Sequence, residues 1–206
     1  MGKITDIRPQ QRAKSRVNIY VDGEYAAALE ALTAKAGGLE IGTEISRERL
    51  AELEAESERE SALRRAFSYV SRRMRTEHEL HEYLKGKGYG DNIIDQVIEN
   101  LKSYGYIDDD EFVRSYVENK SGVRGKRRLR HDLGMLGAEE STVNAVLDEL
   151  GDQREAAAKA AEKYLRSHSY DYKKLCAHLS AKGFEWDDIR AAVRGIGKEE
   201  EDEGSI

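Results

Sequence analysis

Gly125-Lys-Arg-Arg-Leu-Arg-His-Asp-Leu133, with Gly137 four residues further on, is the stretch that decides the fold of this 206-residue chain. It opens with a helix-capping residue type, places leucines four and eight residues later, and ends with a glycine. The same ungapped 26-residue pattern begins at Thr76 and at Asp171. Repetition of this kind is typical of helical arrays, in which each module packs against its neighbours.

The repeated positions predict which side of each module is buried. We expect the leucines in the core of a second helix, the glycine in the left-handed position that ends it, and apolar residues along a third helix. These positions are Leu80, Leu84, Gly88, Ile94, Ile98 and Leu101 in the first copy, Leu129, Leu133, Gly137, Val143, Leu147 and Leu150 in the second, and Leu175, Leu179, Gly183, Ile189, Val193 and Ile196 in the third.

The first 45 residues differ from the repeats and predict a small β region. Arg16 to Val21 is β-branched and alternating, and Asp22-Gly23 is a strong hairpin turn because both central positions of such a turn need positive φ. The other elements expected here are a return strand, a further strand and a helix, at Glu24–Ala26, Lys3–Arg8 and Ala26–Lys35.

The sequence therefore predicts a mainly α protein: tandem three-helix repeats in an elongated curved array, with a small N-terminal β-hairpin region. The expected divisions are the N-terminal region with its short helix, a linker helix with repeat 1, repeat 2, repeat 3 and an acidic tail, at residues 1–45, 46–107, 108–151, 152–197 and 198–206. The early part of the linker helix is polar, and we expect it to be a solvated arm.

The expected shape can be tested by small-angle scattering. Thin repeats that each bury only one face should give a radius of gyration clearly above the value of about 17 Å expected for a compact globule of this length. A compact value would contradict the elongated array.

Composition indicates the cellular environment in which the protein is expected. The single cysteine, Cys176, cannot form an internal disulfide, and no apolar run of 18 residues suggests a membrane span. We expect a monomer in a reducing cytoplasm, without membrane contact. The net charge of −6 argues against nonspecific coating of nucleic acid.

The charge is unevenly distributed, and the second repeat is basic. From Phe112 to Leu136 there are seven Lys and Arg residues against two acids. Cations at a helix start oppose the helix dipole, which hints that they serve a partner. The alternative is a solvated basic face with local acid partners such as Asp132. The candidate partner- or DNA-binding residues are Arg124, Lys126, Arg127, Arg128 and Arg130, together with Arg72, Arg73 and Arg75 before the second helix of repeat 1.

Catalytic and metal-binding patterns are weak. His78 and His81 lie three apart on an expected helix, but no second ligand pair accompanies them. The glycine-containing stretches at Gly86–Gly90 and Gly122–Lys126 lack the spacing of phosphate-binding loops, and helix ends explain them better. Asp108 and the acids after it are expected to cap a helix. We therefore expect no enzyme, no cofactor and no metal.

Three segments resemble the RecX family: Ser71-Arg-Arg-Met-Arg-Thr-Glu-His-Glu-Leu80, Gly105-Tyr-Ile-Asp-Asp-Asp-Glu-Phe112, and the central stretch from Gly125 to Leu133 with its glycine. The resemblance covers about residues 60–197. Asp132 stands where the family commonly has glutamate, and the third repeat keeps the pattern less strictly.

The resemblance implies a function that the residues alone do not supply. RecX proteins are small cytoplasmic regulators of the recombinase RecA, which acts in homologous recombination, DNA repair and the SOS response. A protein of this kind would bind RecA–DNA filaments and limit filament growth, strand exchange and ATP hydrolysis by RecA, with a weak DNA contact left open. The alternative is a helical DNA-binding module that acts through phosphate contacts independently of RecA.

Overall fold

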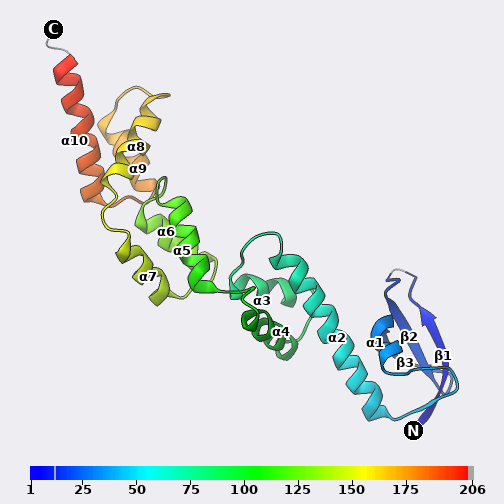
Figure 1. Ribbon diagram of the computed structural model, residues 1–206. Helices are drawn as coiled ribbons and strands as arrows, with labels where there is room; N and C mark the ends of the chain where they lie inside the picture. Colours follow the sequence, from blue (N-terminus) through cyan, green and yellow to red (C-terminus); the bar gives the residue numbers. More distant parts are fainter. Residues whose placement is uncertain (12, 204–206) are drawn as a thin grey trace. The chain divides into compact units, whose positions relative to one another are not determined.

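A computed structural model describes residues 1–11 and 13–203, with side chains up to residue 196 (Figure 1). The acidic tail predicted at 198–206 therefore lies outside the residues whose side chains are described. The elements are β1 (Gly2–Pro9), β2 (Arg16–Val21), β3 (Glu24–Glu30), α1 (Ala31–Ala36), β4 (Glu44–Ile45), α2 (Arg47–Val70), α3 (Glu77–Lys85), α4 (Asp91–Ser103), α5 (Asp109–Lys120), α6 (Lys126–Met135), α7 (Glu140–Glu149), α8 (Arg154–Leu165), α9 (Tyr172–Ala181) and α10 (Trp186–Glu203). The prediction of tandem three-helix repeats after an N-terminal β region is confirmed.

The chain divides into two compact units. The first comprises residues 1–74 and 80–106, and the second comprises residues 75–79 and the chain from 107 onward. The start of α3 thus belongs to the second unit, while the rest of that helix belongs to the first.

The N-terminal sheet has the strand order β3-β2-β1-β4, and its neighbouring strands are antiparallel. Asp22 and Gly23 have φ values of 51° and 88°, so the predicted hairpin turn is confirmed. The helix predicted from Ala26 is wrong as far as Glu30, because β3 continues to that residue. Pairing of β3 along β2 places Leu29 in the core, and this packing outweighs the helix propensity of the alanines.

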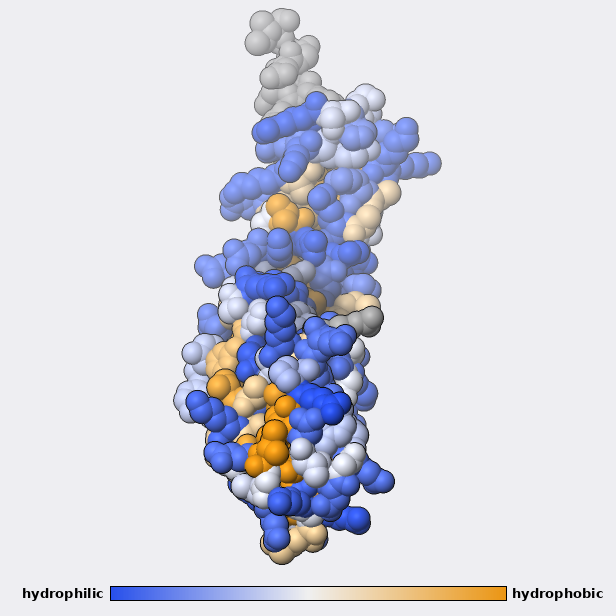
Figure 2. Space-filling view, turned by 90° about the vertical axis from the view of Figure 1, so that its right-hand side faces the viewer, coloured by the Kyte–Doolittle hydropathy of each residue, from blue (hydrophilic) through white to orange (hydrophobic). Residues whose placement is uncertain are grey.

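The early part of α2 is not a solvated arm. Leu50 and Leu53 are buried against Ile4, Ile19 and Leu29 of the sheet. Figure 1 shows α1 and the start of α2 beside the strands, and Figure 2 shows hydrophobic side chains gathered over this N-terminal region within a largely hydrophilic surface. The apolar face of the sheet thus supplies the partner that makes this charged helix part of a core.

Each repeat buries the face that its pattern predicts. The two leucines of every second helix are fully buried, and the apolar residues of the third helix pack against them. The buried pattern residues are Leu80, Leu84, Ile94, Ile98, Leu101, Leu129, Leu133, Val143, Leu147, Leu175, Leu179, Ile189 and Val193. In repeat 1 the first helix contributes the buried Ala62, Ala66 and Val70.

Glycines end each second helix as predicted, and polar side chains cap the starts of α2, α3, α5 and α9. Gly88, Gly137 and Gly183 have φ values of 90°, 76° and 88°. Thr76 forms a capping box, because its Oγ1 accepts from the backbone N–H of Glu79 at 3.1 Å. Glycine is favoured at the helix ends because it adopts positive φ without a Cβ penalty.

The start of α3 docks onto the glycine turn that ends α6. Thr76 is fully buried, and its Oγ1 donates to the carbonyl oxygen of Leu136 at 2.6 Å. A Cβ added at Gly137 would overlap the side chain of His78. We term this contact the first junction, and all of its residues belong to the second unit.

The start of α6 docks in the same way onto the turn that ends α9. The Gly125 N–H donates to the Lys182 carbonyl at 2.9 Å, and the Arg127 N–H donates to the Gly183 carbonyl at 3.1 Å. A Cβ added at Gly125 would overlap the backbone of Gly183 and of Phe184. This is the second junction, and here glycine is required because two backbones meet.

A side chain from the next first helix completes each junction. The Glu77 N–H donates to Asp109 Oδ1 at 2.8 Å, and the Lys126 N–H donates to Gln153 Oε1 at 2.8 Å. Both donors are orphan amides of a helix start, which need a partner when they are buried. The buried Gln153 also donates from Nε2 to the carbonyl oxygens of Ser121 and Arg124.

The first junction can be tested through its hydroxyl. Thr76→Val should lower the free energy of unfolding by about 1–2 kcal/mol, because it removes a helix cap and the bond to Leu136. Thr76→Ser keeps the hydroxyl and should lose clearly less. Urea unfolding followed by circular dichroism measures both, and equal losses would mean that the hydroxyl contributes nothing.

Candidate partner-binding surface

The basic run of repeat 2 surrounds the start of α6. Arg127, Arg128 and His131 are spaced by three and four residues within α6, so they share one side of this helix, and Arg124 lies in the loop just before it. Lys126 and Arg130 lie four apart and point elsewhere. The candidate residues of repeat 2 therefore occupy two sides of one short helix, which expose different cations.

Asp132 organises the shared side. Its carboxylate accepts from Arg124, accepts from Arg128 Nε at 2.9 Å, and lies 3.6 Å from His131 Nδ1, with only 12% of its side chain exposed. Arg124 also donates to the Tyr116 hydroxyl at 2.9 Å. Burial and the nearby Asp132 charge raise the pKa of Tyr116. The local acid partner considered from the sequence is therefore present, and it fixes the orientation of two arginines.

Arg127 is bound to the next repeat. Its Nη2 donates to the Ser180 carbonyl and hydroxyl oxygens, each at 3.0 Å, and to the Phe184 carbonyl at 3.3 Å. These bonds fasten α6 to the end of α9. Arg127 is thus part of the second junction as well as of the basic surface.

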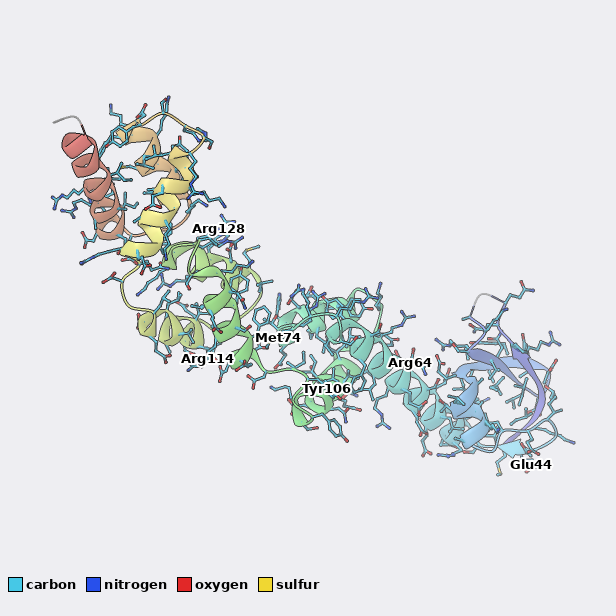
Figure 3. All side chains as sticks on the ribbon, turned by 45° about the horizontal axis from the view of Figure 1, so that its top comes forward. Glu44, Arg64, Met74, Tyr106, Arg114 and Arg128 are labelled. Atoms are coloured by element: carbon cyan, nitrogen blue, oxygen red, sulfur yellow. The ribbon has the colours of Figure 1, made fainter. Side chains whose placement is uncertain are left out.

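Arg128 and Arg130 are exposed on α6, as is Arg127. The Arg128 side chain is 49% exposed, and Figure 3 labels it on this helix. Arg130 is exposed and donates from Nε to Asn144 Oδ1 at 2.9 Å. The half-buried Lys126 contributes its backbone N–H to Gln153.

The three arginines of repeat 1 have different environments. Arg72 is exposed in the turn after α2, and Arg73 donates from Nη1 to the Met74 carbonyl at 2.9 Å. The Arg75 side chain is 14% exposed and pairs with Glu79 Oε1 at 3.0 Å. Arg72 and Arg73 belong to the first unit and Arg75 to the second, and the pairing of Arg75 is structural.

Sequence reasoning missed a contribution from α9. A groove of about 670 Å³ lies between α6 and α9. Lys173 and Lys174 share the side of α9 that lines it, since Ala177 and Ala181 follow at helical spacing. At the repeat offset of 46 residues, these lysines are the counterparts in the third repeat of Arg127 and Arg128. The residues lining the groove are Arg127, Arg128, His131, Ala177, Ser180, Ala181 and Gly183.

The described residues can also be considered for metal binding and for crossing a membrane. Among them, no three His, Cys, Asp or Glu side chains gather where they could hold a metal ion. Within the same part of the chain, every helix is too short or too polar to cross a membrane.

Comparison with known proteins identifies the family. Residues 2–46 match the "Regulatory protein RecX N-terminal domain", and residues 62–101 match "RecX, first three-helix domain". "Regulatory protein RecX" of Clostridioides difficile (strain 630) is 33% identical over 205 residues, covering 95% of this chain and 96% of that protein. This chain belongs to the RecX family. The RecX protein of Clostridium tetani is 30% identical over 205 residues and covers 95% of both chains.

Solved RecX structures share the fold. A crystal structure of regulatory protein RecX aligns with a TM-score of 0.66 and 27% identity, covering 94% of this chain and all of that one. RecX from Lactobacillus salivarius aligns with a TM-score of 0.61 and 23% identity over 68% of this chain, which is a likeness of fold alone. The resemblance drawn from the three sequence segments is confirmed, and the RecX relatives are named as regulatory proteins.

Proposed function

We propose that this protein is a regulator of the recombinase RecA, acting as an inhibitor that binds RecA–DNA filaments. It would limit filament growth, strand exchange and ATP hydrolysis by RecA. Membership of the RecX family carries this proposal. The fold agrees with a binding role, because its helical repeats expose an ordered set of cations and its described residues form no metal cluster.

The binding residues are proposed to be the exposed cations of α6, with Arg72 and Arg73 as further candidates. Arg128 and Arg130 reach solvent, while Arg124 and Arg127 are held by Asp132 and by the end of α9. Charged groups fixed by neighbours lose less conformational freedom on binding than freely moving ones. Arg128 is both exposed and held by Asp132, so it is proposed as the principal contact.

The proposal is tested by adding the protein to RecA filaments on single-stranded DNA and following ATP hydrolysis. The wild-type chain should inhibit. A triple variant, Lys126→Glu, Arg128→Glu and Arg130→Glu, should need at least about tenfold more protein for half-inhibition. The reason is that glutamates replace the positive charges proposed to contact the RecA–DNA filament. Arg124 and Arg127 stay unchanged because their bonds support the fold.

A matched control makes the same charge change elsewhere. Lys35→Glu, Arg47→Glu and Arg65→Glu alter exposed residues of α1 and α2 and should inhibit like wild type. If both triple variants lose inhibition equally, overall charge and not the α6 surface is responsible. If the wild-type chain leaves RecA unaffected, the proposed function is wrong.

The DNA-binding alternative is favoured by the exposed cations of α6, and a salt series separates it. If phosphates are the target, binding to bare single-stranded DNA should fall with salt by about 0.7 in log–log slope per contact. We expect weak binding to bare DNA throughout, since a chain of net charge −6 repels a polyanion beyond the local contact.

A further inference from the structure

The groove between α6 and α9 has a wall of basic side chains and a floor of alanines. Arg128 and His131 form the wall, and their side chains are 49% and 64% exposed. Ala177 and Ala181, both exposed, form the floor. The groove is shallow and open to solvent, with a volume of about 670 Å³.

The cations of the groove are held in place. Asp132 accepts from Arg128, and three bonds to Ser180 and Phe184 fix Arg127. Asp132 stands behind these groups, and none of the described residues that line the groove carries a carboxylate. The guanidinium groups therefore present a positive surface whose geometry is set before any ligand arrives.

The chemistry of the groove favours a carboxylate ligand carried on a peptide. Arginine binds planar carboxylates through paired donors, and arginine clusters recognise acidic segments. The alanine methyl groups offer apolar contact to an aliphatic side chain, which a sugar–phosphate backbone does not provide. An extended nucleic acid would also continue past the groove along a chain of net charge −6, whereas a short peptide would not.

We propose that this groove binds a short acidic peptide segment of a partner protein. The carboxylates lie on Arg128 and His131, with Lys173 and Lys174 extending the positive path along α9. An aliphatic side chain of the segment packs on Ala177 and Ala181. This inference deepens the proposed function and rests on it. It states that the basic surface binds the protein component of the filament and not the DNA.

The test uses fluorescence anisotropy with the full chain and a labelled peptide of about eight residues made of Asp, Glu and Leu. A neutral peptide with Asn and Gln, and a single-stranded oligonucleotide of similar charge, are the comparison ligands. The acidic peptide should bind most tightly. Arg128→Gln should weaken it about tenfold, while Arg65→Gln, at an exposed site on α2, should change it less than about twofold.

A second pair of variants fills the space without touching a charge. Ala177→Leu should weaken peptide binding about tenfold by occupying the floor, and Ala55→Leu, at an exposed site on α2, should not. Circular dichroism confirms that the variants are folded. Equal effects of Arg128→Gln and Arg65→Gln, tighter binding of the oligonucleotide, or no peptide binding would each overturn the inference.

The inference and the proposed function fail in different ways. If the wild-type chain inhibits RecA but does not bind the acidic peptide, the proposed function stands and the inference about the groove is wrong. If the chain binds the peptide through Arg128 but leaves RecA unaffected, the groove is a peptide-binding site and RecA is not its partner.

Discussion

Gly125→Ala should lower the free energy of unfolding by about 3 kcal/mol or more and release repeat 3 from repeat 2. The new methyl group would overlap backbone atoms of Gly183 and Phe184, which no side-chain rotation can relieve. Opening the second junction also breaks the backbone bonds donated by Gly125, Lys126 and Arg127, each contributing about 1 kcal/mol. Urea unfolding measures the loss, and hydrogen exchange should speed up in α9 and α10.

Gly134→Ala is the matched control on the same helix. A methyl group there meets no atom within 4 Å, and Gly134 lies inside α6. Alanine in a helix interior is more stable than glycine by about 0.5–1 kcal/mol, so this variant should melt later than wild type. If both alanine variants change stability in the same direction, the junction does not depend on close backbone approach.

Leu133→Ala should cost about 2–5 kcal/mol, because Leu133 is fully buried among the side chains of α5, α6 and α7 and its truncation leaves a cavity. Arg130→Ala should stay within about 0.5 kcal/mol, since Arg130 is exposed three residues earlier on the same helix. Chemical denaturation of the two variants side by side checks the buried face. Similar denaturation midpoints for the two variants would mean that a different face of α6 is buried.

The repeats could be predicted because their information is local. Leucines four residues apart and a closing glycine specify a helix face and its end without reference to the rest of the chain. The β3 strand and the start of α2 could not be predicted in this way. Leu29 and Leu53 lie in alanine-rich or charge-rich segments that favour helix or solvent, and only their packing together in the N-terminal core decides their state.

The candidate site shows the same limit. The sequence identified the basic run and named Asp132 as a local acid partner, since the two are adjacent in the chain. It could not reveal that Arg127 is bonded to Ser180, 53 residues away, or that α9 forms the floor of a groove. Which cations are exposed and which are held depends on contacts between repeats, and these are set by the fold.

The two junctions have one consequence for exchanging repeats between proteins of this kind. The first junction uses a threonine hydroxyl and Asp109, whereas the second uses the bare backbone of Gly125 and Gln153. Each helix start is matched to the turn that it contacts, so a transplanted repeat carries one half of a junction without the matching half. The first junction joins residues between 76 and 137 and the second joins residues between 125 and 184, so every cut between Thr76 and Phe184 separates the two halves of at least one junction. Chimeric chains should therefore keep residues 76–184 together and be cut outside this segment.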